Sequence, residues 1–163
     1  VPQVNSAAYA RLIVSYAKFA PMGSRGFGLS RASMYGLNAE DYVARANDAT
    51  SVIVLAEHVD AVENIEEICK VEGVDAVFIG PYDLSASFNK IGRVHDREVL
   101  DAIKHIRDVC RAHGMPVGIH GATPDFLVSH MRDGFSLLSA SADIAIFAAG
   151  ARHLLETLRG AKP

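Results

Sequence analysis

Two acidic residues follow apolar runs that have the character of buried strands. Glu57 comes directly after residues 52–56, and Asp83 follows residues 74–79 after the turn Gly80-Pro81-Tyr82. The carboxyl ends of neighbouring parallel strands lie at one edge of a sheet, so both carboxylates are expected there. Converging carboxylates repel unless a cation or proton joins them, and oxygen ligands favour Mg²⁺ or Mn²⁺ over zinc. The alternative is that one carboxylate caps the following helix and the other is solvated.

The turn that precedes Asp83 offers a second kind of chemistry. Gly80 and Pro81 force the chain sharply out of the preceding strand. The backbone N–H groups of Tyr82 and Asp83 would then point inward and bind an anion, such as a substrate carboxylate. The alternative is an ordinary strand-to-helix turn in which the Asp83 side chain caps the helix.

The histidines and cysteines indicate a functional role less clearly. His120 follows a third apolar run and could contact a substrate at the same edge, although a bond to a neighbouring loop explains it equally well. His58 is expected to point away from Glu57, because side chains alternate along a strand. Cys69 and Cys110 are expected to be small buried hydrophobic residues on helices, not nucleophiles. The other histidines are predicted to be surface groups: His95, His105, His113, His130 and His153.

These residues must be positioned by elements that alternate along the chain. Strands are predicted over residues 52–56, 74–79, 115–119 and 135–139, with the end of another at 1–4. Helices are predicted over 6–19 and 39–48, from 61 towards Gly73, from Asp96 to near Gly114, from Thr123-Pro124 to Gly134, and through Ile146 to Leu158, with a loop over 21–36. Apolar strands that alternate with helices are typical of a parallel sheet covered on both faces. An open doubly wound sheet and part of a (β/α)8 barrel both fit.

Composition narrows the class of protein. The chain has 163 residues, of which 50% are hydrophobic and 21% charged, which fits one folded domain or one large piece of a bigger one. A net charge of -3 argues against binding to nucleic acid, and no run approaches the roughly 20 apolar residues of a membrane span. Two cysteines make no disulfide framework, and no leader-like segment opens the sequence, so we expect a reducing, cytoplasmic location.

Residues 73–85, Gly-Val-Asp-Ala-Val-Phe-Ile-Gly-Pro-Tyr-Asp-Leu-Ser, closely resemble the signature of the HpcH/HpaI aldolases, a family of class II, metal-dependent pyruvate aldolases. Residues 1–4, 21–28 and 31–33, and Glu57 with the residues that follow it, agree in order and spacing. The resemblance implies a (β/α)8 TIM barrel of the phosphoenolpyruvate/pyruvate type. Residues 1–163 would then be one domain, the C-terminal part of a barrel from about strand 4 to strand 8.

The resemblance also implies a site and a mechanism. Glu57 and Asp83 match the family's two metal carboxylates, and Gly80, Pro81, Tyr82 and Asp83 match the segment that holds the pyruvate carboxylate. The implied cofactor is Mg²⁺ or Mn²⁺, with Co²⁺ as an alternative. Such a metal acts as a Lewis acid on the keto oxygen, so that loss of a methyl proton gives a stabilised enolate. The enolate attacks an aldehyde, and retro-aldol cleavage is the reverse.

The sequence departs from the family pattern in two respects. Leu55 stands where the family usually has a glutamine, two residues before the metal glutamate, so substrate choice or reaction is expected to differ. The family's catalytic arginine and base-side histidine lie on strands before residue 1. Arg25 and Arg31 match a different, glycine-rich loop at the barrel rim and are expected to stabilise that loop.

The resemblance favours a lyase that cleaves or forms a carbon–carbon bond in 4-hydroxy-2-oxo acids. The expected partners are small 2-oxo acids, such as pyruvate or oxaloacetate, and further copies of the chain. A homo-oligomer, commonly a hexamer with C-terminal helices packed between subunits, is implied. One alternative is a related lyase or synthase that acts on citryl, malyl or oxaloacetate-like compounds. Another is an inactive partial barrel that serves only in assembly.

Overall fold

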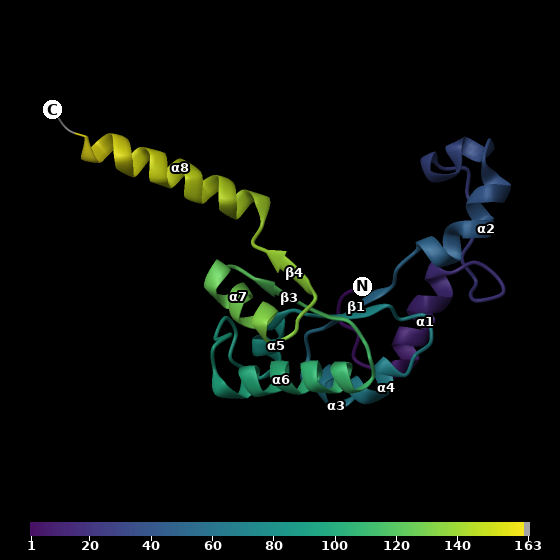
Figure 1. The fold of residues 1–163 in the computed structure, drawn as a ribbon, viewed down its shortest axis with the longest axis horizontal. Helices are drawn as coiled ribbons and strands as arrows, with labels where there is room; N and C mark the ends of the chain where they lie inside the picture. Colours follow the sequence, from purple (N-terminus) through teal and green to yellow (C-terminus); the bar gives the residue numbers. More distant parts are fainter. Residues whose placement is uncertain (162–163) are drawn as a thin grey trace.

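A four-stranded parallel sheet forms the centre of the computed structural model, which describes residues 1–161 (Figure 1). The strands are β1 (Ile53–Ala56), β2 (Ala76–Ile79), β3 (Val117–Gly121) and β4 (Leu137–Ala140). They lie in the order β1-β2-β3-β4, so that each strand pairs with the next one in the sequence. Every carboxyl end therefore points to the same edge of the sheet, as the predicted site requires.

Helices connect the strands. Between β1 and β2 lie α3 (Val59–Glu63) and α4 (Ile65–Cys69); between β2 and β3 lie α5 (Pro81–Ser87) and α6 (Arg97–Ala112); α7 (Pro124–Arg132) precedes β4 and α8 (Asp143–Gly160) follows it. Before β1 the chain forms α1 (Ala7–Ala17), the 3-10 helix η1 (Arg31–Gly36) and α2 (Ala39–Ala49). Within residues 1–161, no helix is both long enough and apolar enough to cross a membrane.

Two predicted helix starts are confirmed by hydrogen bonds to the capping residues. Ser6 accepts a hydrogen bond from the N–H of Tyr9 at the start of α1, and Asp96 accepts one from the N–H of Glu98 at the start of α6. The single helix expected from residue 61 towards Gly73 is wrong, because the chain kinks at Asn64 and forms α3 and α4. The predicted loop over 21–36 also ends in the helix η1.

Residues 1–4 run beside β1 without forming a regular strand. The N–H of Leu55 donates to the carbonyl of Val1 (2.8 Å), and the N–H of Val4 donates to the carbonyl of Leu55 (3.1 Å). In a regular parallel ladder one residue lies between the two that bond to the same partner, whereas here two residues, Pro2 and Gln3, lie between Val1 and Val4. Gln3 takes a left-handed backbone conformation, with φ of 54°, and produces this bulge.

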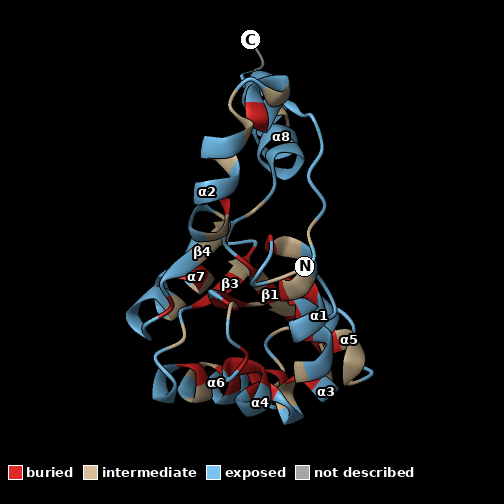
Figure 2. Ribbon diagram, turned by 90° about the vertical axis from the view of Figure 1, so that its right-hand side faces the viewer, coloured by how far each residue is buried: buried red, intermediate tan, exposed pale blue. Residues whose placement is uncertain are grey.

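The two faces of the sheet are covered unequally. The residues that face the helices are 0–2% exposed: Val54, Ala56, Val77, Ile79, Val117 and Ile119. Figure 2 shows this buried layer facing α4 and α6. Ile53, Leu55, Phe78 and His120 point to the opposite face and are only half-buried. The expectation that both faces are covered is therefore wrong for the described residues, and the half-covered face is the one that lines the interior of a closed barrel.

The last helix lies apart from the sheet. In Figure 1, α8 extends away from the other elements, and it has no buried residue. Its apolar side chains are 51–73% exposed: Ile144, Ile146, Phe147, Leu154, Leu155 and Leu158. A helix with such an apolar surface normally packs against a partner.

Candidate functional site

One row of residues crosses the carboxyl end of the sheet on its half-covered face. Ala56 pairs with Ile79 and Ile79 pairs with Ile119, so the next residues along, Glu57, Gly80 and His120, follow one another across β1, β2 and β3. His120 pairs in turn with Ser139 of β4. The sheet thus places the predicted metal glutamate, the start of the predicted anion-binding turn and the candidate histidine in one line.

Glu57 is an acidic residue held in a buried position. It is 4% exposed, and the backbone N–H of Gln3 donates to its Oε1 at 3.0 Å. Burial raises the pKa of Glu57 above its usual value, and the negative charge of the nearby Asp83 adds to the increase, while the hydrogen bond from Gln3 opposes it. The ionised form is therefore disfavoured unless a positive charge lies beside it.

Asp83 reaches the same place from the first turn of α5. Gly80 is the N-cap of this helix, Pro81 occupies its first position, and the first helical hydrogen bond runs from the N–H of Leu84 to the carbonyl of Gly80. The N–H groups of Tyr82 and Asp83 precede that bond, so no carbonyl of the helix can accept from them. The predicted turn at Gly80 and Pro81 is present, and the inward direction of these N–H groups and their binding of an anion stay predictions.

The two carboxylates fit a hard divalent cation. Among residues 1–161 there is no group of three or more His, Cys, Asp or Glu side chains placed to hold a metal ion. A two-carboxylate site would leave the other coordination positions to water and substrate oxygens, which is usual for Mg²⁺. The raised pKa of Glu57 supports this fit, because a cation there would relieve the cost of the buried charge.

Of the three histidines near the carboxyl edge, only His120 belongs to the row. The Nδ1 of His120 lies 3.1 Å from the Oγ of Ser139, so this side chain has a partner on the neighbouring strand rather than in a loop. His58 points away from Glu57, as predicted, and its Nδ1 accepts from the N–H of Asp60. His95 is exposed, as predicted, but it also lines a cavity beside the turn.

One of the two loop arginines, Arg25, stabilises the loop in the way the sequence suggests, and the role of Arg31 stays a prediction. The guanidinium of Arg25 lies 4.7 Å from the ring centroid of Phe19 and donates to the hydroxyl of Tyr42 at 2.9 Å. Arg31 is exposed at the start of η1. Leu55 shares a sheet face with Glu57, so the position where the family usually has a glutamine contributes an apolar side chain to this face.

The cysteines are buried neighbours. Cys69 of α4 and Cys110 of α6 are free thiols whose sulfur atoms lie 3.7 Å apart. The contact with Cys69, together with burial, raises the pKa of the Cys110 thiol above its usual range, so this thiol is protonated at neutral pH. Neither side chain belongs to the row, and both are part of the packing between helices.

Sequence reasoning missed one contributor to the site and one contact within it. Gln3 acts through its backbone N–H, which no pattern of residue types reveals, and only a left-handed φ at a non-glycine residue points that group at Glu57. The sequence places Ser139 at the end of a predicted strand, at the edge expected to carry function, but its contact with His120 depends on the register between β3 and β4.

Known proteins are similar to this chain in sequence and in fold. A 2-dehydro-3,6-dideoxy-6-sulfogluconate aldolase from Pseudomonas putida is 40% identical over 161 residues, which are 98% of this chain and 63% of that protein. A hydroxypyruvate/pyruvate aldolase from Cupriavidus necator is 36% identical and covers 98% of this chain and 60% of its own length. The chain thus spans less than two thirds of these relatives.

A solved structure agrees. A HpcH/HpaI aldolase/citrate lyase family protein from Burkholderia cenocepacia superposes with a TM-score of 0.92 at 29% identity, over 97% of this chain and 63% of the other. This match and the all-parallel sheet identify the fold as part of a (β/α)8 barrel. The profile of the family described as HpcH/HpaI aldolase/citrate lyase matches residues 1–144. The chain therefore belongs to the HpcH/HpaI aldolase/citrate lyase family.

Proposed function

We propose that this chain carries the metal-binding half of a lyase that cleaves and forms a carbon–carbon bond in 4-hydroxy-2-oxo acids, with pyruvate as one product. The observation that carries the proposal is the buried Glu57 carboxylate beside Asp83 at the carboxyl edge of β1 and β2. Relatives named as aldolases, one of them a hydroxypyruvate/pyruvate aldolase, support this class of reaction.

Glu57 and Asp83 would hold the cation, Mg²⁺ or Mn²⁺ with Co²⁺ as an alternative. When bound, such a cation supplies Lewis-acid stabilisation of the negative charge that develops as the methyl group of pyruvate loses a proton. Glu57 contributes a carboxylate with a fixed direction, because Gln3 holds Oε1 and the α-carbon of Gly80 leaves room for Oε2. Little rearrangement is then needed when the cation binds.

The turn would orient the substrate. The N–H groups of Tyr82 and Asp83 would donate to the carboxylate of the 2-oxo acid, while Pro81 keeps the turn in one conformation. Leu55 would present an apolar side chain where the family usually has an amide. The imidazole of His120 is tied to Ser139, and it is the weakest of the proposed substrate contacts.

A second candidate is a related lyase or synthase that acts on citryl, malyl or oxaloacetate-like compounds. The description of the family includes citrate lyase, and Leu55 departs from the aldolase pattern, so both observations favour this alternative. An inactive partial barrel that serves in assembly is the third candidate. The exposed apolar surface of α8 is the observation that favours it.

We also propose that the protein assembles as a homo-oligomer in a reducing, cytoplasmic compartment. The six exposed apolar side chains of α8 would be covered by another subunit, in an assembly that the family resemblance suggests is a hexamer. The two thiols, 3.7 Å apart and unlinked, are compatible with reducing conditions.

Titration of Mn²⁺, followed by electron paramagnetic resonance, tests the metal assignment. We compare the wild type with Glu57→Gln and Asp83→Asn, and each substitution is expected to weaken binding at least about tenfold. Asp125→Asn is the matched control, because Asp125 lies in the first turn of α7 much as Asp83 lies in that of α5. The assignment is wrong if both site variants bind Mn²⁺ as tightly as the wild type does.

A further inference from the structure

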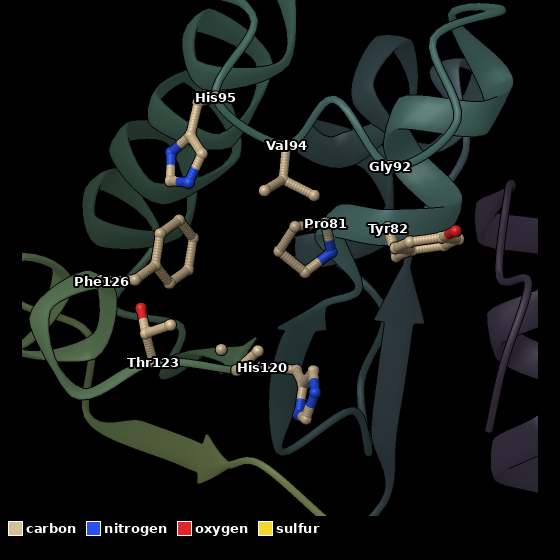
Figure 3. Close-up of a pocket in the computed structure, with 10 residues that line it drawn as sticks. Pro81, Tyr82, Gly92, Val94, His95, His120, Thr123 and Phe126 are labelled. Atoms are coloured by element: carbon tan, nitrogen blue, oxygen red, sulfur yellow. The ribbon is translucent and has the colours of Figure 1, made fainter. Parts of the chain in front are cut away.

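A cavity of about 350 Å³ opens beside the turn that starts α5 (Figure 3). Its walls come from that turn, from the loop over residues 88–96, from the end of β3 and from α7. Six of its lining residues carry the argument: Pro81, Tyr82, Val94, His95, Thr123 and Phe126. Pro81 and Tyr82 belong both to the turn and to the wall, so a molecule held by the turn can extend into the cavity.

The lining is mostly apolar. In Figure 3 the side chains of Pro81, Val94, His95 and Phe126 surround a common space, and the ring of His120 points away from it. The rings of His95 and Phe126 meet edge to face, with centroids 5.7 Å apart and an interplanar angle of 74°. No Asp, Glu, Lys or Arg is among the described residues that line this cavity. A charged or heavily hydroxylated group would therefore lose its hydration here without full replacement.

The loop that forms one wall is held in place by several bonds. The buried Ser85 accepts from the N–H of Gly92 at 2.9 Å and donates to the carbonyl of Tyr82 at 2.6 Å, which ties the loop to α5. Lys90 lies 2.9 Å from a carboxylate oxygen of Asp96, which also caps α6. The wall is thus pre-formed, as small-molecule sites usually are, and the volume lies within the roughly 300–1,000 Å³ of such sites.

We propose that this cavity receives the side chain of the aldehyde acceptor, and that the preferred acceptors carry an aromatic or branched aliphatic group. The proposal rests on the function proposed above. In the reaction, a bond forms between the methyl carbon of pyruvate and the aldehyde carbon. The methyl carbon loses one proton, the aldehyde oxygen gains one, and nothing is oxidised or reduced. The substituent on the new alcohol carbon would then lie between Phe126 and Val94.

Acceptor preference is the first test, made with the full-length enzyme that contains this chain. With pyruvate as donor, the wild type is expected to show a kcat/KM for benzaldehyde at least tenfold above that for glycolaldehyde. Val94→Trp fills the cavity and should lower that ratio at least tenfold. Val43→Trp, on an exposed apolar residue of α2, is the matched control and should keep the wild-type ratio.

Two further measurements separate the failure of this inference from the failure of the proposed function. Benzyl alcohol cannot react as an acceptor, and its binding, followed by NMR without metal, should perturb resonances of His95 and Phe126. Ala122→Leu narrows the cavity from an exposed lining residue and should weaken that binding if Val94→Trp does not fold. If benzyl alcohol binds but neither aldehyde reacts, the proposed function fails and the apolar site remains. The inference would be overturned if the ratio of kcat/KM for benzaldehyde to that for glycolaldehyde were the same in the wild type, Val94→Trp and Ala122→Leu. It would also be overturned if benzyl alcohol perturbed neither resonance.

Discussion

Gly80 leaves open the space that the carboxylate of Glu57 occupies. A β-carbon at residue 80 would lie 2.6 Å from Oε2 of Glu57 and 3.2 Å from its β-carbon. These distances are shorter than a normal contact, so any side chain at residue 80 would displace the glutamate from its present position. The glycine that begins the turn is therefore also a condition for the position of the neighbouring carboxylate.

The first prediction is that Gly80→Ala weakens Mn²⁺ binding at least about tenfold, because Glu57 must move away from the added methyl group. The free energy of unfolding should fall by less than the free energy of Mn²⁺ binding does, since the Glu57 side chain can rotate away from the added methyl group. Gly150→Ala in α8 is the control. Nothing lies within 4 Å of its added carbon, and the change should stabilise the helix by about 0.5–1 kcal/mol. Unchanged Mn²⁺ affinity in Gly80→Ala would contradict the prediction.

The second prediction concerns stability and pH in the absence of metal. Burial raises the pKa of Glu57 in the folded chain above its value of 4.5 in the unfolded chain, so the folded chain holds the proton more tightly. The stability that comes from the protonated form is complete below pH 4.5 and is lost as the pH rises through the folded pKa. Glu57→Gln should therefore be more stable than the wild type at neutral pH.

Denaturant unfolding between pH 4 and pH 8 measures this difference. The advantage of Glu57→Gln should vanish near the acid end of the range, and added Mn²⁺ should stabilise the wild type but not the variant. Glu63→Gln, an exposed glutamate on α3, should show no such pH dependence. A wild type that is more stable than Glu57→Gln at pH 7 without metal would show that the ionised glutamate is well compensated in the folded chain.

The sequence predicts those features of the fold that depend on local patterns. The four apolar runs become β1 to β4, and α1 and α6 begin directly after Ser6 and Asp96, where the predicted helices begin. A continuous helix after β1 also fits the apolar spacing, but the kink at Asn64 is a tertiary effect. The side-chain amide of Asn64 donates to the carbonyl of Asn5 at 3.0 Å, a contact across 59 positions that no local pattern contains.

The sequence also predicts part of the candidate site, namely the residues whose positions depend on the order of the strands. The order of the strands follows from the alternation of strands and helices, and it brings Glu57 and Asp83 to one edge. The row from Glu57 to Ser139 needs the register of three strand pairs, which apolar runs without alternation leave undetermined. The backbone bond from Gln3 needs a left-handed conformation that glutamine rarely adopts, so its residue type gives no signal.

The third prediction is that the 163-residue chain self-associates when it is studied alone. The β4 strand pairs only with β3, so its other edge is unpaired within the described residues, and α8 exposes apolar side chains such as Phe147 and Leu154. Sedimentation velocity should show species that grow with concentration. Phe147→Glu combined with Leu154→Glu should reduce this association, whereas Arg152→Glu on the same helix should not. A sharp monomer with cooperative unfolding would contradict the prediction.

The fourth prediction is that chemistry retained by this chain alone favours decarboxylation of oxaloacetate over aldol cleavage. Both reactions place negative charge on the same three-carbon unit, which Glu57, Asp83 and the turn at Tyr82 are proposed to hold. Retro-aldol cleavage must also remove a proton from the 4-hydroxyl group, and the family resemblance places the base for that step before residue 1. General-base catalysis is typically worth about 100- to 10,000-fold, whereas decarboxylation needs no base because carbon dioxide leaves.

The measurement compares pyruvate release from oxaloacetate and from a 4-hydroxy-2-oxo acid, with Mg²⁺ or Mn²⁺ present and the rate of the free metal subtracted. Glu57→Gln should abolish the excess decarboxylation, which ties the rate to the proposed site rather than to a contaminating enzyme. Both rates should be low, since the arginine that the family uses is also expected before residue 1. Aldol cleavage as fast as decarboxylation would mean that a residue of this chain acts as the base. His120 would be the first residue to substitute, because its imidazole lies in the same row as Glu57, with Nδ1 already 3.1 Å from the hydroxyl of Ser139.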